Sequence, residues 1–429
     1  MADPPAPQPP ADPPPDVDGL ESPDDLHDDL VGGQTRTFSF NKPAELRLDR
    51  FLHQAIGGFS RHQIQRIIDL GGVKLNGKPT KPAAKLKAGD TLEVFLPPKP
   101  SDHLEPEELP IEVLHEEPGF IVVNKPADMI VHPARGRRNG TLLNALAYHF
   151  IATGQAQPPD DPNADEHPDA TLSDVGRDDA RPGVIHRLDM NTTGCIVVGK
   201  RETAHWKLAK QFEDRTNLKC YLALVHGHPD PPSGHVDQPL GRHPTIREAQ
   251  AVRHDAIGRD SLTLYRTRET YPGYALVECE LKSGRTHQIR VHMSYIGHPL
   301  VGDILYGGLP IGPAEIDDPP YPPAARPMLN FANTKEDGLK LEAASIEREQ
   351  AGDLYLRTPA LHAALLRLDH PETREAMTFT APLHEPFRSL VHRLRRHAAA
   401  VGHDIHDPSR TITDGTHIDL DAAVPPTTP

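Results

Sequence analysis

The stretch GVIHRLDMNTTG, residues 183–194, contains a candidate catalytic carboxylate. Asp189 follows Arg187 and precedes a small polar turn, and the apolar pair Val184-Ile185 indicates a strand just before them. An aspartate at such a strand end can be an N-cap or one half of an ion pair. It can also act as a nucleophile or base, because it is ionised at neutral pH. The stretch by itself leaves both interpretations open.

Other catalytic and cofactor patterns find no support in the chain. The histidines near the candidate motifs do not have the spacing of a metal site, and no CxxC pair occurs. There is no GxxxxGK[ST] loop and no GxGxxG loop, and Ser283 is not in a GxSxG elbow. We therefore expect neither a metal nor a nucleotide cofactor. We expect the three cysteines to be buried thiols; they are Cys195, Cys220 and Cys279.

The charge of the chain is unevenly distributed. The formal net charge is −15, but four segments together carry −23, which leaves +8 on the remainder. These acidic segments are residues 1–38, 155–181, 309–356 and 403–429. The part expected to fold is therefore basic, and a nucleic acid remains a possible partner.

Length and composition predict two folded units with additional segments between and around them. The chain has 429 residues with 47 prolines and few aromatic residues. We expect disordered tails at 1–40 and 403–429, a Pro-rich linker at 96–108, and insertions at about 155–181 and 309–356. No apolar run reaches the roughly 18 residues of a membrane span, and no signal peptide is visible. We therefore expect no membrane association, a cytoplasmic location and a monomer.

Residues 45–95 predict a small unit of two helices and a sheet. Apolar residues recur at helical spacing from Leu46, Ser60 stands where an N-cap belongs, and Gly71-Gly72 closes the second helix. VKLNGKPT then alternates as a strand and turns at Asn76-Gly77, and TLEVF forms the last strand.

This unit resembles the S4 RNA-binding module. The resemblance is carried by LRLDRFL, SRHQIQRIIDLGGVKLNGKPT and LKAGDTLEV. It implies that the helix pair and the hairpin present cations to structured RNA. The candidate phosphate contacts, which would supply salt-dependent affinity, are Arg47, Arg61, Arg66, Lys74 and Lys78.

Residues 109–397 predict a larger unit in which strands and helices mix without regular βαβ alternation. IEVLHEEPGFIVVNKP, GCIVVGK, LKCYLALVHG and a hairpin around Tyr271-Pro272-Gly273 indicate strands. A helix begins at Thr141, and others cover ETAHWKLAKQFEDRT, RTHQIRVHMSYIG and EPFRSLVHRLRRH. The pattern predicts an α+β fold around a mixed, largely antiparallel sheet.

The larger unit resembles the RluA-type pseudouridine synthases, in particular RluC- and RluD-like members. The resemblance runs through seven blocks in the family's order: VNKPADMIVHPA, TLLNALAYH, RPGVIHRLDMNTTGCIVVGK, LKCYLALVHGHP, PLGRHPTIREAQAV, KSGRTHQIRVHMSYIGHPLVGDILYG and LHAALLRLDHPETREAMTFTAPL. It implies a pseudouridine synthase fold and a cofactor-independent isomerase. In that reaction the uracil of a uridine in RNA is detached at N1, rotated and rejoined to the sugar through C5.

The resemblance assigns roles to individual residues. Asp189 corresponds to the catalytic aspartate, Arg290 to the arginine paired with it, and Tyr221 to the tyrosine that stacks on the base. Arg187 corresponds to the arginine that fills the place of the flipped nucleotide, since a base must leave the stack to be reached. Without the family context, Tyr221 would read as a core tyrosine and Arg290 as a surface cation.

Three further residues are expected to contact the substrate or to position the site. Arg285 and His287 are candidates for phosphate contacts or for holding other site residues in place. Leu361 is expected to line the site of the base, although a plain core leucine would look the same.

The chain departs from the family pattern in two places. It has Thr193 where serine is usual and Asp128 where glycine is usual, and the proposed chemistry uses neither. The combination with an S4 module predicts an RNA partner, 23S ribosomal RNA or a pre-ribosomal particle. A transfer RNA substrate, or a non-catalytic ribosome-assembly role, is the alternative.

Overall fold

The structure is a computed structural model that describes most of the chain in two compact units. The described residues are 34–40, 47–56, 61–69, 71–96, 104–133, 137–155, 172–173, 175, 181–320, 335–405 and 418–424. The smaller unit contains the described residues up to 96 together with 137–138, and the larger unit contains the rest.

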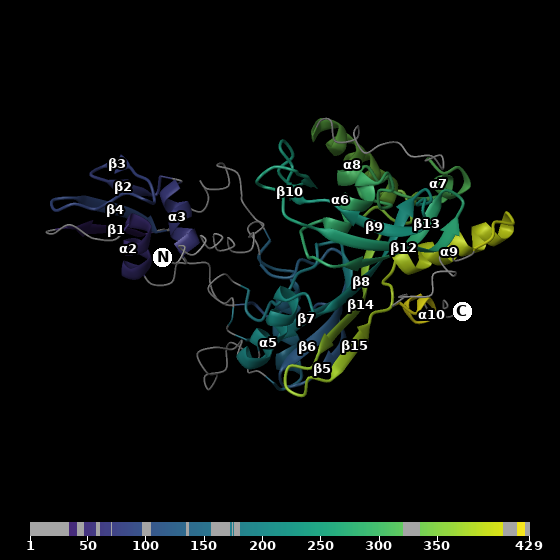
Figure 1. Cartoon of the computed structure of the whole chain (residues 1–429), viewed down its shortest axis with the longest axis horizontal. Helices are drawn as coiled ribbons and strands as arrows, with labels where there is room; N and C mark the ends of the chain where they lie inside the picture. Colours follow the sequence, from purple (N-terminus) through teal and green to yellow (C-terminus); the bar gives the residue numbers. More distant parts are fainter. Residues whose placement is uncertain are drawn as a thin grey trace, which may run out of the picture. The chain divides into compact units, whose positions relative to one another are not determined.

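The smaller unit is a four-stranded antiparallel sheet with two helices (Figure 1). The strand order is β1-β4-β2-β3. The elements are β1 (Gln34–Ser39), α2 (Leu48–Ala55), α3 (Arg61–Asp69), β2 (Val73–Leu75), β3 (Lys78–Pro79) and β4 (Thr91–Leu96). The predicted hairpin is confirmed: Asn76 and Gly77 have φ of 52° and 75°, the left-handed backbone that this tight turn requires. Apolar residues from both helices and from the sheet form one core.

The first strand of this unit was not predicted. Residues 34–39 were expected to belong to a disordered tail, but they form β1 and pair with β4 along its whole length. Phe38 and Phe40 both contact the ring of Phe51 on α2, with centroids 5.6 Å and 4.9 Å away. This apolar contact orders the segment. The expected N-cap, Ser60, lies outside the described residues.

The larger unit is built on a nine-stranded sheet. Its order is β5-β6-β7-β14-β8-β13-β12-β9, with β15 also paired to β14. The strands are β5 (Glu112–Glu116), β6 (Phe120–Lys125), β7 (Thr193–Gly199), β8 (Leu218–His226), β9 (Ser233–Asp237), β12 (Leu262–Tyr271), β13 (Tyr274–Leu281), β14 (Leu361–Asp369) and β15 (Ala376–Thr380). Among the described strands of this sheet, only the β7–β14 pair is parallel. β10 (Leu240–Arg242) and β11 (Gln250–Val252) form a separate pair.

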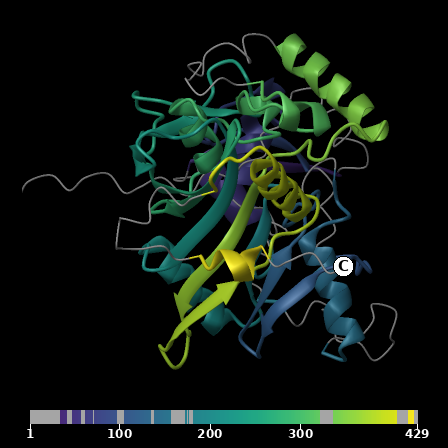
Figure 2. The ribbon, with the colours of Figure 1, turned by 90° about the vertical axis from the view of Figure 1, so that its right-hand side faces the viewer.

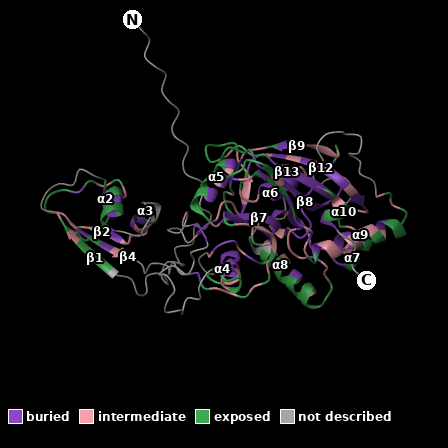
Figure 3. Ribbon diagram, turned by 90° about the horizontal axis from the view of Figure 1, so that it is seen from below, coloured by how far each residue is buried: buried purple, intermediate pink, exposed green. Residues whose placement is uncertain are grey.

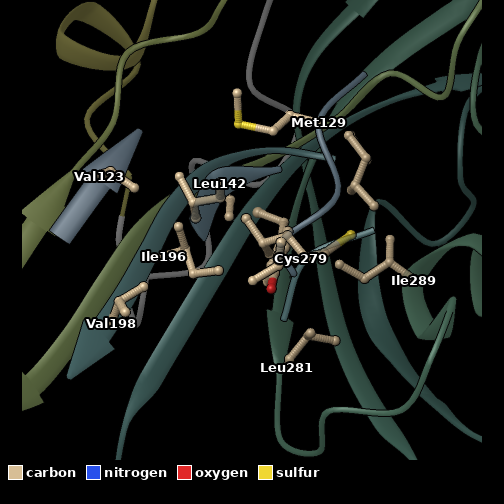
Figure 4. Packing of buried hydrophobic residues seen from close by; sticks show 14 of the residues in the cluster. Val123, Met129, Leu142, Ile196, Val198, Cys279, Leu281 and Ile289 are labelled. Atoms are coloured by element: carbon tan, nitrogen blue, oxygen red, sulfur yellow. The ribbon is translucent and has the colours of Figure 1, made fainter. Parts of the chain in front are cut away.

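Hydrophobic clusters cover both faces of the sheet. Along β8, Tyr221 and Ala223 face one cluster, whereas Cys220 and Leu222 face the other, as the two-residue period of a strand requires. Figure 4 shows the first cluster, where Val123, Ile196 and Cys279 of the sheet lie with other apolar side chains. The central strands are correspondingly buried in Figure 3, while most helices expose one side.

Helices cover the sheet and close its ends. They are α4 (Leu142–Ala152), α5 (Glu202–Glu213), α6 (Gln288–Tyr295), the 3-10 turn η2 (Ile304–Tyr306), α7 (Pro313–Asp317), α8 (Lys335–Gln350), α9 (Phe387–Ala400) and α10 (Leu420–Ala423). α9 lies across the strands in Figure 2 and contributes Leu390 and Leu394 to the second cluster. The observed mixed sheet with flanking helices confirms the predicted α+β class.

Several predicted irregular segments are in fact structured. Residues 104–108 were expected to be linker, but Leu104 is buried in the first cluster. In the 309–356 segment, Ile311 and Leu356 pair as a β-bridge, and α8 forms where Lys, Glu, Ala and Leu favour a helix. In the expected C-terminal tail, Ala423 is buried and its carbonyl accepts a hydrogen bond from the Leu383 N–H at 2.8 Å. Tertiary contacts therefore order residues around Leu104, Ile311 and Ala423, and local helix propensity favours α8.

Two further expectations can be compared with the structure. The three cysteines are free and buried, as predicted. Within the described part of the chain, no helix is both long and apolar enough to cross a bilayer.

Candidate active site

The loop that carries Asp189 is fixed to β7 on its N-terminal side. The Gly199 N–H donates to the Gly183 carbonyl at 2.8 Å, and the Val197 N–H donates to Nε2 of His186 at 3.1 Å. The His186 ring stacks on Phe212, with centroids 4.5 Å apart. Burial lowers the pKa of His186 to about 3, so the ring is neutral and can accept this bond. His186 therefore has a structural role in this loop.

A buried lysine fixes the same loop on its C-terminal side. The Lys125 ammonium is fully buried and donates to the carbonyls of Pro126, Met129 and Met190 at 2.8–2.9 Å. Met190 directly follows Asp189, and the Thr192 N–H donates to the Asp189 carbonyl at 3.1 Å. The backbone on both sides of Asp189 is therefore tied down. A catalytic group needs such support to hold its geometry.

The predicted strand before Asp189 does not form. Val184 makes a single β-bridge to Val198, and the residues from there to β7 are irregular. The hydrogen bonds to Gly183 and His186 and those donated by Lys125 hold this segment in place of the expected strand. Asp189 therefore stands on a braced loop.

The Asp189 side chain is directed to Arg290 and His287. Its Oδ2 lies 3.4 Å from Nη1 of Arg290 and 3.7 Å from Nε2 of His287, and the side chain is 30% exposed. Its carboxylate is thus an ion-pair partner that solvent or a substrate can still reach, which decides against the capping interpretation.

Arg290 is held by a second carboxylate. Its Nε and Nη2 donate to the two oxygens of Asp303 at 2.7 Å and 2.8 Å, and its Cζ lies 4.9 Å from the ring centroid of Tyr306. This bidentate pair fixes the plane of the guanidinium, so that only Nη1 is directed at Asp189. Arg290 and Asp303 are both buried. The alternative of a surface arginine is therefore wrong.

His287 links the same cluster to Tyr306. The Tyr306 hydroxyl accepts a hydrogen bond from the Gln250 N–H at 2.8 Å and lies 2.7 Å from Nδ1 of His287. This contact between the hydroxyl and Nδ1 holds the ring with Nε2 on the side of Asp189. His287 adopts a left-handed backbone with φ of 55°, an uncommon conformation for a residue with a side chain.

The electrostatic environment keeps Asp189 charged. Burial alone would raise the pKa of its carboxyl, but His287, Arg290 and Arg187 outweigh burial and lower it below its ordinary value. Asp189 is therefore a carboxylate at neutral pH and can attack or deprotonate an electron-poor centre.

Tyr221 and Leu361 come from neighbouring strands of the sheet. Tyr221 is on β8, and Leu361 is on β14 opposite Ala223, two residues further along β8. Burial, with the nearby Asp189 charge, raises the pKa of Tyr221, so it carries a neutral hydroxyl at neutral pH. Both residues belong to the first cluster, and Tyr221 is 7% exposed. The structure thus brings Tyr221 near Asp189 and leaves Leu361 as part of the adjoining core.

The other predicted contacts are distributed more widely. Arg187 lowers the pKa of both Asp189 and His132, which places its charge beside both residues. Arg285 is exposed on the turn before α6. In the smaller unit, Arg47 forms an ion pair with Asp49 at 3.0 Å, and Lys74 and Lys78 are exposed. The side chains of Arg61 and Arg66 lie outside the described residues.

Sequence reasoning missed the residues that position the predicted ones. Asp303 and Tyr306 lie in GDILYG and Lys125 lies in VNKPADM, stretches that carry the family resemblance without a role being assigned to them. A charged residue inside such a block, surrounded by apolar neighbours, was the available signal. Among the described residues, no group of three or more His, Cys, Asp or Glu side chains could hold a metal ion.

Comparison with family models gives two matches. The model described as RNA pseudouridylate synthase matches residues 119–295, and the S4 domain model matches residues 46–92. The first match contains Asp189, Tyr221 and Arg290.

Curated proteins and a solved structure are also similar to the chain. Ribosomal large subunit pseudouridine synthase D of Haemophilus influenzae is 35% identical over 350 residues, covering 81% of this chain and 91% of the relative. The protein of the same name from Zymomonas mobilis is 36% identical over 351 residues, covering 81% and 93%. Human RNA pseudouridylate synthase domain containing 4 aligns with a TM-score of 0.43 and 22% identity, covering 66% of this chain and 93% of that one.

Proposed function

Because the chain belongs to the RNA pseudouridine synthase family, we propose that it isomerises uridines in large-subunit ribosomal RNA, with Asp189 as the catalytic carboxylate. Two relatives named for the ribosomal large subunit match most of the chain and more than nine-tenths of their own length. The match to an S4 domain supports the same class of substrate.

The arrangement of Asp189, Arg290 and Asp303 carries the assignment of the site. A buried guanidinium would normally satisfy one carboxylate, but here it is clamped by Asp303 and has one nitrogen left, 3.4 Å from Asp189. Asp189 thus keeps its charge while its own oxygens are only weakly engaged. A carboxylate used only to stabilise the fold would take the stronger, bidentate position.

The reaction is an isomerisation in which atoms and charge balance within the substrate. The C1′–N1 bond breaks, the uracil turns, C1′ bonds to C5, C5 loses its proton and N1 carries one in the product. Asp189 acts at C1′, where electron deficiency develops, either as nucleophile or by taking a proton from the sugar. Tyr221 stacks on the uracil and offers a neutral hydroxyl for the proton transfer at C5.

Arg187 and the smaller unit are proposed to handle the RNA. The target nucleotide must leave its stack to bring C1′ to Asp189, and the Arg187 guanidinium can occupy the place it vacates. The exposed side chains of Lys74 and Lys78 would contact phosphates. We also propose that the protein acts as a monomer. We place the enzyme in the cytoplasm, where it would act on ribosomal RNA or a pre-ribosomal particle.

Tritium release from C5-labelled uridine tests the proposal. The wild-type chain should release tritium from large-subunit ribosomal RNA, and Asp189→Asn should reduce the rate by at least about 10³-fold, the order expected when a nucleophile is lost. Asp128→Asn is the matched control, because this exposed loop carboxylate has a positive φ that asparagine also tolerates. It should release tritium at the wild-type rate.

Two other outcomes are informative. Release from transfer RNA but not from ribosomal RNA would contradict the proposed substrate and leave the chemistry in place. If the wild-type chain releases no more tritium than Asp189→Asn from either RNA, the catalytic proposal is wrong.

A further inference from the structure

Lys219 is a half-buried lysine whose charge is not neutralised within the described structure. It lies on β8 two residues before Tyr221, so the two side chains leave the sheet on the same face. Its Nζ lies 5.6 Å from the ring centroid of Phe212 and 3.3 Å from the position that a Cβ on Gly284 would take. Among the described residues, no hydrogen-bond acceptor or carboxylate is paired with this ammonium.

The other buried lysines of the larger unit behave differently. Lys125 donates to three carbonyls. Lys200, 8% exposed, donates to Glu116 at 2.7 Å and to Gln155 at 2.6 Å. A buried cation is costly unless it is paired, and these two follow the rule. Lys219 does not, which indicates that its partner comes from outside the described chain.

The charged surroundings of Lys219 strengthen this conclusion. Arg215, which follows α5, lowers the pKa of Lys219 by like-charge repulsion. Lys219 in turn lowers the pKa of His186, which lies on the other side of Phe212. Neither is an anion. On the adjoining strand β13, Glu280 is opposite Cys220 and is ion-paired with Lys282. On β14, Arg367 is opposite Leu218. Because Leu218 and Cys220 alternate with Lys219 along β8, Arg367 and Glu280 point to the opposite face of the sheet.

The position of Lys219 relates it to the proposed active site. Through Phe212 and His186 it adjoins the loop that carries Asp189, and through Gly284 it adjoins the turn that carries Arg285. The glycine at 284 leaves room beside the ammonium that a side chain would restrict. An RNA strand bound at Asp189 carries phosphates on both sides of the target nucleotide and could supply an anion to Lys219.

We propose that Lys219 binds a phosphate of the RNA backbone next to the target uridine. The inference rests on the proposed function, since the RNA supplies the anion. A phosphate would complete the hydrogen bonds of the ammonium and neutralise it beside Arg215. It would also hold the strand while the uridine is turned toward Asp189 and Tyr221.

The proposed contact has a pH signature. Burial, together with Arg215, lowers the pKa of Lys219 to about 8. Lys219 is therefore charged below about pH 8 and loses its proton as the pH rises above this value. The phosphate contact should weaken between about pH 7 and 9.5. Lys219→Arg keeps a charge throughout this interval and should bind RNA with no such loss.

Binding of the full chain to a transcript of bacterial large-subunit ribosomal RNA tests the contact. Lys219→Met keeps most of the apolar stem but removes the charge. It should bind about tenfold more weakly near 0.1 M salt, with the slope of log Kd against log salt reduced by about 0.7–0.9. Lys219→Arg should retain the wild-type slope. Lys210→Met is the matched control, because Lys210 is already paired with Glu213 and Asp214 on α5, and it should change neither quantity.

The proposal is overturned if Lys219→Met keeps the wild-type slope, whether or not its melting temperature falls, because the lysine would then serve packing on Phe212. It is also overturned if Lys219→Arg loses affinity above pH 8 as the wild type does. Tritium release is measured in parallel. A wild-type chain that binds with the expected slopes but releases no tritium would refute the proposed function and leave the phosphate contact standing.

Discussion

At the scale of single residues, Arg290 divides its donors between two carboxylates of different exposure. Asp303 is 1% exposed and takes two nitrogens, while Asp189 is 30% exposed and takes one. The stronger pair is therefore the one that a substrate cannot reach. Its effect is to orient Arg290, and through Arg290 to hold Asp189 charged and aligned. Asp303 is in this sense a positioning residue.

Asp303→Asn should slow the chemical step and leave substrate binding largely unchanged. Asparagine can still accept one hydrogen bond from Arg290, but it cannot hold the guanidinium as a charged bidentate partner. We expect kcat to fall about 100-fold, the order associated with a small misplacement of a catalytic group, with KM changed less than about threefold. Single-turnover rates and KM on ribosomal RNA provide the measurement.

A second buried ion pair in the same unit is the control for Asp303. Arg268 and Glu278 are also buried and paired, on β12 and β13. Glu278→Gln should lower the melting temperature about as much as Asp303→Asn does, yet leave kcat within about twofold, because a buried partner lost mainly costs stability. Equal kcat values for the two variants would contradict the positioning role of Asp303.

At the scale of elements, the glycines of the Asp189 stretch allow close backbone packing. Gly194 has φ of 110°, and a Cβ there would lie 2.3 Å from the Ala363 carbonyl oxygen on β14. Gly183 has φ of 73°, and a Cβ there would lie 2.4 Å from the Gly199 carbonyl oxygen. The two glycines flank the Asp189 loop, so that the loop is held against β7 and β7 against β14.

Gly194→Ala should therefore destabilise the protein strongly. The added methyl both strains the backbone and forces β7 from β14, and we expect a loss of more than about 3 kcal/mol. Gly154→Ala is the matched control: φ is 71° there, but the position has open space around it. It should cost only about 1 kcal/mol. Thermal melting of both variants checks this, and similar melting temperatures would show that backbone packing at Gly194 is unimportant.

Most strands and helices of the larger unit could be predicted from periodicity, but some segments could not. The residues before Asp189 look like a strand and are held instead by His186 and Gly183. α8 and α10 lie in acidic segments that composition assigns to disorder. Their formation depends on local helix propensity and on contacts with distant residues, such as that between Ala423 and Leu383.

At the scale of the whole molecule, the charge is divided between acidic segments and a basic remainder. The net charge of −15 hides an excess of cations outside four acidic segments. In the smaller unit, Lys74 and Lys78 are exposed next to the Asn76-Gly77 turn. Because phosphate contacts release counterions, such lysines contribute affinity that depends on salt.

The double variant Lys74→Ala and Lys78→Ala should weaken RNA binding without changing the chemistry. We expect the slope of log Kd against log salt to fall by about 1.4–1.8, so that the loss of affinity is largest at low salt. The rate at saturating RNA should stay unchanged. Lys210→Ala, whose charge is already paired, is the control. An unchanged slope in the double variant would exclude the hairpin from the RNA interface.

The sequence by itself determined the kind of protein and supplied the candidates for its reactive residues. Ordered blocks of residues carried the family resemblance, and with it Asp189, Tyr221 and Arg290, since these residues occur within short local motifs. Only the tertiary structure decided how they are held. Asp303 clamps Arg290, Tyr306 holds the ring of His287, and Lys219 has no anionic partner among the described residues. Each of these depends on which side chains meet across distant parts of the chain. Local periodicity carries no information about such meetings.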